Sequence, residues 1–137
     1  MSQENVDIVR AAWQAFDAGD VDRAFEVFAA NVDWHVPQDS WGEFGGSGHY
    51  RGVGRVAGWL ADMYGAWEPF ELDAEEISDA GDDRVIVVLS ARGREPGSGL
   101  EVEHHPAGVT TLSARKVLSV VWHPTREAAL QAVGVSE

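Results

Sequence analysis

The sequence predicts a single α+β domain, for two reasons. Apolar residues recur at helical spacing in the first half of the chain, and segments typical of strands fill most of the second half. Helices and strands are therefore segregated, without the βαβ alternation of a doubly wound sheet. The length of 137 residues is enough for one hydrophobic core, and we expect one domain over residues 1–137.

Two helices are expected first. The residues that recur at spacings of three and four in the first segment are Val6, Val9, Trp13 and Phe16. They share one face of a helix that we expect to end at Gly19. Asp20 is a typical N-cap residue and predicts a second helix over residues 21–30.

A short strand and a long loop follow these helices. Apolar and polar residues alternate over residues 32–36, which predicts a strand that ends at Pro37. Residues 37–54 contain six of the fifteen glycines and are predicted to form a loop. A loop of this length in a small domain is commonly functional, for instance as a lid. A third helix is predicted over residues 53–64.

The remaining chain is predicted to be mostly strand. The expected strands are residues 70–75, 84–91, 100–112 and 117–123. The second of these contains the sequence VIVVL, which is apolar on both faces and indicates a central strand covered on both sides. The third is expected to bend at Pro106 or Gly108. Thr125 is predicted to cap a terminal helix over residues 126–133.

Composition and charge exclude several classes of function. The net charge of −13 gives a surface that repels phosphate backbones and anionic lipids, so we expect neither nucleic acid nor a membrane as a partner. The absence of cysteine excludes disulfides and thiolate chemistry. No signal peptide or membrane-spanning segment is recognisable, and a cytoplasmic location is expected. The six tryptophans indicate a thick aromatic core, an aromatic-lined cavity, or both.

Several segments together resemble a known family. They include AFDAGDVDRAFEVFAANVDW, HYRG, ISDAGDDRVIVVL, LEVEHHPAGVTTL and VVWHPTREAALQAVG. In this order they resemble the nuclear transport factor 2-like superfamily, specifically its SnoaL-like branch. The resemblance implies a cone-shaped, strongly curved antiparallel sheet wrapped around three helices, with a short C-terminal helix. It also implies an apolar pocket at the wide end and a homodimer formed through the outer sheet face.

The resemblance also implies which side chains line the pocket. From the strands these are Trp34, Val36, His104, Gly108, Leu118, Val120 and Trp122, and from the helices Trp13, Phe16, Trp59, Met63 and Tyr64. Trp41 and Phe44 belong to the glycine-rich loop, where exposed aromatic rings would be costly, so we expect them to cover the pocket mouth. Val121 then points outward, toward the expected dimer surface.

The acidic and phenolic groups that carry the chemistry of known relatives are missing. The positions that match the general base, the oxyanion-hole acid and the oxyanion-hole tyrosine of the steroid isomerases are Val36, Gly108 and Ala12. Trp122 matches the acid of the epoxide hydrolase. The resemblance therefore argues against steroid isomerisation and against that epoxide hydrolysis mechanism.

Histidine and tyrosine are the remaining candidates for catalysis. His104 is the first candidate general acid or base, because its strand position points inward and imidazole titrates near neutral pH. The alternative is a surface histidine at a strand end, since either His104 or its neighbour His105 must face outward. His49 and Tyr50 lie where the loop meets the third helix and are candidate hydrogen-bond donors to a ligand. Tyr50 could equally plug the cone.

Three function hypotheses remain from the sequence. The first is a cofactor-independent acid/base enzyme, such as an isomerase, cyclase, dehydratase or hydrolase, acting on a small and largely apolar molecule. The second is a protein that binds such a molecule without turnover. The third is a structural or interaction protein whose cone is filled by its own tryptophans. No metal-ligand spacing is present, and the segment from Gly52 to Ala57 lacks the preceding buried strand of a dinucleotide site.

Overall fold

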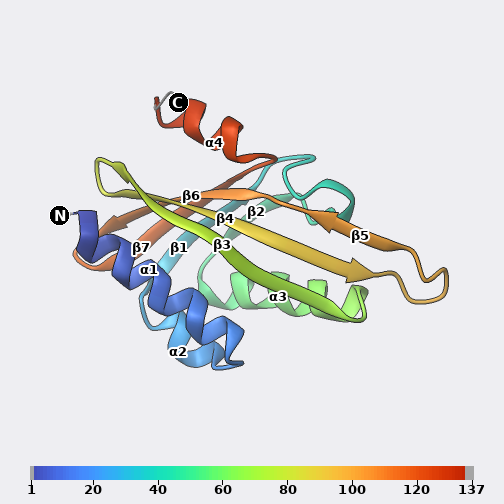
Figure 1. The fold of residues 1–137 in the computed structure, drawn as a ribbon. Helices are drawn as coiled ribbons and strands as arrows, with labels where there is room; N and C mark the ends of the chain where they lie inside the picture. The colour runs from blue at the N-terminus through green and yellow to red at the C-terminus, as the bar shows by residue number, and fades with distance from the viewer. Residues whose placement is uncertain (1, 135–137) are drawn as a thin grey trace.

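The computed structural model describes residues 2–134 (Figure 1). Its helices are α1 (Ser2–Asp17), α2 (Val21–Phe25), α3 (Val53–Ala66) and α4 (Arg126–Ala132), with a 3₁₀ turn, η1, at Gly42–Phe44. Its strands are β1 (Phe28–Val36), β2 (Gly48–Arg51), β3 (Phe70–Gly81), β4 (Arg84–Arg94), β5 (Glu101–His104), β6 (Ala107–Ser113) and β7 (Lys116–His123). The predicted α+β class is confirmed.

The seven strands form one curled sheet in the order β2-β1-β7-β6-β4-β3, and β5 pairs with the far end of β4. All pairs are antiparallel except β1 with β7, so the sheet is mixed where a wholly antiparallel one was expected. A tight hairpin requires antiparallel strands, but no hairpin joins β1 to β7. Most of the chain separates them, so either direction of pairing was available.

Helices cover both faces of the sheet (Figure 1). α1 and α3 pack on the concave face, where the larger core lies, and α4 packs on the opposite face. β4 contributes to both cores, because Val85 and Val87 face the first while Ile86 and Val88 face the second beside Ala129 of α4. The prediction that the VIVVL segment is a central strand covered on both sides is confirmed.

The boundaries between α2, β1 and β2 differ from the prediction. α2 ends at Phe25 rather than near residue 30, and β1 begins at Phe28. Phe28 pairs with Val117 of β7, whose N–H donates to the carbonyl of Val27 at 2.7 Å. The apolar residues of this segment suit a helix locally, but pairing with the sheet satisfies their backbone groups instead. The predicted loop also contains β2, which pairs with the last residues of β1.

The strand predicted over residues 100–112 is two strands, broken at His105 and Pro106.

Leu118 of β7 was expected to face the interior but is 41% exposed. Thr111 pairs with Ser119 while the next residue, Leu112, pairs with Val117. Leu118 is therefore the extra residue of a β-bulge, and the bulge changes the face on which it lies.

Candidate ligand-binding site

Four tryptophans fill the inside of the curled sheet. Trp34 and Trp122 come from adjacent strands, Trp41 from the loop before η1, and Trp59 from α3; all four are buried. Their ring centroids form a closed circuit with separations of 4.9, 5.0, 5.3 and 5.4 Å in tilted or edge-to-face arrangements. Such contacts add to the stabilisation from burial itself. The aromatic residues therefore pack against one another here, and the space they fill is not an open chamber.

Gly108 is part of this packing. A Cβ atom at Gly108 would lie 2.9 Å from the ring of Trp122 and 3.0 Å from a methyl group of Val120. The missing side chain thus makes room for the indole, where the prediction had Gly108, Val120 and Trp122 lining a cavity. Val36 is also buried in the core. None of these four residues lines the open groove described below.

The segment of residues 37–47, which we name the lid loop, closes one side of this aromatic core. Its two aromatic residues, Trp41 and Phe44, are both buried. Trp41 enters the tryptophan circuit, and Phe44 packs edge-on against Trp67 and Phe70 at centroid distances of 4.8 and 5.4 Å. The lid loop is therefore anchored by its own hydrophobic residues in addition to hydrogen bonds.

Three side chains hydrogen-bond to backbone carbonyls of the lid loop. His104 Nε2 donates to Ser40 O at 3.1 Å, Trp59 Nε1 donates to Gly46 O at 2.9 Å, and the Tyr50 hydroxyl donates to Gly46 O at 3.1 Å. The carbonyl can only accept, so Nε2 of His104 carries the proton in this bond. These contacts give His104 and Tyr50 a visible role in positioning the loop.

His104 and His105 point in opposite directions. His104 pairs with the buried Ala91 on the concave side, and its ring lies so close to the lid loop that a Cβ at Gly42 would approach Nδ1 at 3.0 Å. His105 faces outward and bonds to Glu75 and Glu103 at 2.7 and 2.8 Å. The hydrogen bond to Glu75 raises the pKa of His105, burial opposes this rise, and the Glu103 contact adds to it.

His49 lies on the outer face of the sheet. Its Nε2 is 2.6 Å from Asp33 Oδ1, and its ring stacks on that of His35 at 4.6 Å. Burial, together with the nearby His35, lowers the pKa of His123 on the same region of the sheet. His49 therefore faces away from the interior where it was expected to meet a ligand, because the two-residue period of β2 places Tyr50 inside and His49 outside.

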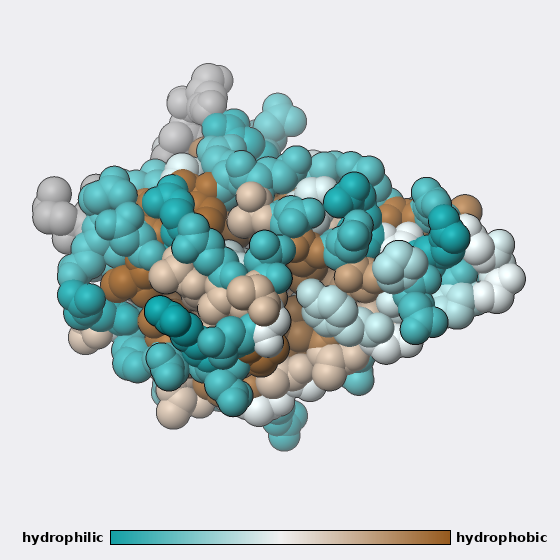
Figure 2. All heavy atoms as spheres, turned by 60° about the horizontal axis from the view of Figure 1, so that its bottom comes forward, coloured by the Kyte–Doolittle hydropathy of each residue, from teal (hydrophilic) through white to brown (hydrophobic). Residues whose placement is uncertain are grey.

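The open site lies between the helices. A groove of about 510 Å³ is bounded by α1, α2, α3 and β3. It is lined by Trp13, Phe16, Asp17, Gly19, Val21, Phe25, Ala57, Leu60, Ala61, Tyr64 and Leu72. Seen from the side of these helices, Figure 2 shows apolar side chains exposed within a mostly hydrophilic surface. A concave, mostly apolar groove of this volume has the properties of a small-molecule site.

Three of the groove residues were among the predicted lining residues. Trp13 and Phe16 lie on one face of α1, with ring centroids 5.0 Å apart, and Trp13 also meets the edge of Trp122 at 6.4 Å. Tyr64 was expected inside but is 50% exposed and lies on the rim. Met63 and Trp59, the other predicted residues of α3, are buried in the core and do not line the groove.

The residues that give the groove its polarity and its far wall were not among the predicted lining residues. Asp17 directly follows Phe16 and lies one helical turn after Trp13, so the spacing along α1 was a usable indication. Leu72 shares a face of β3 with Phe70. Leu60 is one turn before Tyr64 on α3.

The polar groups of the groove are Asp17 and the hydroxyl of Tyr64. Burial raises the pKa of Tyr64, and the negative charges of Asp17 and Asp73 raise it further. Tyr64 therefore stays a neutral hydrogen-bond donor at neutral pH. Within residues 2–134, Asp17 makes no side-chain hydrogen bond or ion pair that would neutralise it. A carboxylate and a phenol thus face the same apolar groove.

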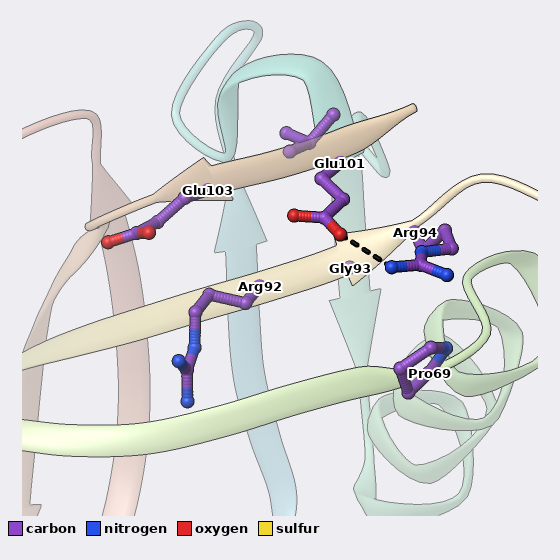
Figure 3. Close-up of a pocket in the computed structure, with 7 residues that line it drawn as sticks. Pro69, Arg92, Gly93, Arg94, Glu101 and Glu103 are labelled. Carbon is purple, nitrogen blue, oxygen red and sulfur yellow. Dashed lines mark hydrogen bonds and ion pairs between the residues drawn. The ribbon is translucent and has the colours of Figure 1, made fainter. Parts of the chain in front are cut away.

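A second, smaller pocket differs in chemistry (Figure 3). It has a volume of about 270 Å³ and lies at the edge formed by β4 and β5. Its arginines pair with acidic neighbours, Arg94 with Glu101 at 2.6 Å and Arg92 with Glu71 at 3.2 Å, and its Glu103 pairs with His105 at 2.8 Å. Because these charges are already satisfied by the protein, the groove between the helices is the stronger candidate.

Within residues 2–134, no group of three or more histidine, aspartate or glutamate side chains is arranged to hold a metal ion. No helix in that range combines the length and apolarity needed to cross a membrane.

Comparison with known proteins identifies the family. The model of the SnoaL-like domain family matches residues 9–121, and the chain belongs to this family. The curated protein sequences contain no match. The resemblance to the SnoaL-like branch of the nuclear transport factor 2-like superfamily is thereby confirmed.

Solved structures share the fold over nearly the whole chain. An NTF2-like protein from Burkholderia xenovorans LB400 is 26% identical, with a TM-score of 0.72 and coverage of 98% of both chains. TerC, co-crystallised with polyporic acid, is 18% identical, with a TM-score of 0.73 and coverage of 95% of this chain and 98% of its own. A hypothetical protein with a ketosteroid isomerase-like fold from Catenulispora acidiphila DSM 44928, in complex with trimethylamine, is 15% identical, with a TM-score of 0.69 and coverage of 95% of this chain and 94% of its own.

Proposed function

We propose that this protein binds a small, largely apolar molecule in the groove between α1, α2, α3 and β3. The observation that carries the proposal is the groove itself, about 510 Å³ of mostly apolar surface beside an interior that tryptophans already fill. Val21 and Tyr64, two of the few large hydrophobic residues exposed on the described surface, both lie on it. Two structural neighbours, TerC and the Catenulispora protein, were crystallised with small molecules, which supports the proposal.

A second candidate function is acid/base catalysis of an isomerisation, cyclisation, dehydration or hydrolysis in the same groove. Its support is the pair of Asp17 and Tyr64, since a carboxylate can accept a proton while a neutral phenol donates a hydrogen bond to developing negative charge. The family also includes isomerases and cyclases. We predicted His104, His49 and Tyr50 as catalytic residues; none of them lines the groove, so Asp17 and Tyr64 take their place in this proposal.

The binding proposal is tested by filling the groove. Ala61 lines it on α3, and Ala61→Phe should reduce the affinity for a neutral hydrophobic dye, N-phenyl-1-naphthylamine, by about tenfold or more, because the added ring occupies the site. Ala11→Phe is the matched control, since Ala11 is exposed on α1 and lies outside the groove. Equal dye affinity in the two variants would contradict the proposal. Recovery of a natural ligand chemically altered would favour catalysis over binding alone.

We also propose a homodimer formed through the outer face of β1, β2 and β7. The apolar cluster that α4 closes on the outer face contains residues of β4 and β6, although α4 also contacts β7. Within residues 2–134 this cluster includes no residue of β1 or β2, and the paired residues His35 and Val121 are only half-buried. Sedimentation of the wild type and of Val121→Lys tests this proposal. A dimer that dissociates in the variant supports it, and a monomeric wild type contradicts it.

A further inference from the structure

We propose that the ligand of the groove is a cation, with an apolar body among the aromatic side chains and a positively charged nitrogen beside Asp17. This inference rests on the proposed binding function and adds the charge of the ligand to it. Among the eleven residues that line the groove, Asp17 is the only charged one. The carboxylate stands at the edge of an apolar site and lacks a basic partner within the described chain.

The position of Asp17 at the C-terminal end of α1 makes the electrostatic potential at the groove more negative. Asp17 is the last residue of a 16-residue helix, and the carbonyl end of a helix carries a partial negative charge. Asp73 is close enough to act electrostatically on Tyr64 of the groove rim, as Asp17 does. Arg92 of β4 is shared between Asp73 and Glu71 at 3.4 and 3.2 Å. Arg10 lines an adjoining pocket with Asp17 and Asp73, but its ion pair is with Asp7 at 3.5 Å. The groove mouth is therefore negative, in a protein whose net charge is −13.

The walls of the groove also suit a cation. Four aromatic rings line it, from Trp13, Phe16, Phe25 and Tyr64. Phe16, the residue before Asp17, meets Phe25 edge-to-face at 5.3 Å and lies tilted against Trp13 at 5.0 Å, so the aromatic wall of the groove adjoins Asp17 in α1. An ammonium group over such rings is attracted by their negative faces. The hydroxyl oxygen of Tyr64 can also accept a hydrogen bond from an N–H group.

An anionic ligand is disfavoured by the same residues. A carboxylate or phosphate in the groove would lie near Asp17 with no lysine, arginine or histidine among the lining residues to balance it. A neutral ligand would gain the apolar contacts and lose the charge attraction. The order of affinity should therefore be cation, then neutral molecule, then anion.

Three probes with one common body test this order at neutral pH: 4-tert-butylbenzylamine, 4-tert-butylbenzyl alcohol and 4-tert-butylbenzoate. By titration calorimetry the amine should bind about five- to tenfold more tightly than the alcohol, and the benzoate most weakly. The preference for the amine should decrease at high salt, because the rim carboxylate is screened.

Asp17→Asn should remove the preference for the amine over the alcohol, mainly by weakening the binding of the amine. Asp22→Asn is the matched control, because it removes the same charge from an exposed residue of α2 that does not line the groove. Equal binding of amine and alcohol by the wild type would overturn the inference while leaving the proposed binding function standing. Failure of all three probes to bind would overturn both.

Discussion

His104 donates a hydrogen bond to the carbonyl of Ser40 at 3.1 Å and so ties β5 to the lid loop. The residue after Ser40 is Trp41, which contacts Trp59 and Trp122 inside the sheet. The histidine that the sequence indicated as a proton carrier is thus in contact with the backbone that places a core tryptophan.

His104→Ala should destabilise the protein by about 1–3 kcal/mol, because the carbonyl of the buried Ser40 loses its partner. Hydrogen exchange within residues 38–47 should accelerate more than in β6. Urea unfolding and exchange mass spectrometry measure the two effects. His105→Ala is the control, with a smaller loss expected for an exposed group. Equal stability of His104→Ala and the wild type would show that the hydrophobic anchors alone hold the lid loop.

Replacing a glycine by alanine should have opposite effects on the stability of the protein at two positions. Gly108→Ala places a methyl group 2.9 Å from Trp122 and should cost about 1–3 kcal/mol of unfolding free energy. Gly58→Ala, in an exposed helical position with no atom within 4 Å, should stabilise by about 0.5–1 kcal/mol. Thermal or urea unfolding of both variants tests the expectation. A neutral Gly108→Ala would mean that the tryptophan circuit can shift without cost.

His105, which faces outward, should make the stability of the protein depend on pH. The bond to Glu75 raises the pKa of His105, so its stabilising contribution is fully present below the unfolded pKa near 6.5 and is lost as the pH rises through the folded pKa. His105→Gln should therefore be less stable than the wild type at pH of about 5.5 and equal to it at pH of about 9. Urea unfolding at the two pH values measures the difference.

The control is a second histidine whose pKa is shifted in the opposite direction. In a proton NMR titration His105 should titrate above its ordinary value, whereas His123 should titrate below it because burial and the nearby His35 disfavour its charge. A stability difference that grows from pH 5.5 to pH 9 would contradict the assignment to His105.

The negative charge of Asp17 should be detectable through its effect on the pKa of Tyr64. The charge of Asp17 adds to burial in raising the pKa of Tyr64, so Asp17→Asn should lower that pKa while leaving it above the ordinary value. NMR of tyrosine labelled at Cζ, in a Tyr50→Phe background, follows Tyr64 alone because the chain has two tyrosines. Asp22→Asn should leave the titration unchanged. An unchanged titration in Asp17→Asn would place the carboxylate away from the groove mouth.

Local sequence patterns determined the class of fold and much of its core. The helical spacing of Val9, Trp13 and Phe16 identified the buried face of α1. The VIVVL segment, apolar on both faces, identified the central strand. Both predictions were possible because the spacing of apolar residues along an element indicates which of its faces is buried. Several segments in their order along the chain, including the one that ends at Trp34, also carried the family resemblance.

Only the tertiary structure decided where the candidate site lies. Whether Trp34, Trp41, Trp59 and Trp122 leave a chamber or close it depends on how indoles from four separated segments pack, and no spacing within one segment specifies that. The same packing turned the lid loop inward and left the groove beside Asp17 as the open site. Local periodicity determines which residues are buried, whereas contacts between distant elements determine what space remains among them.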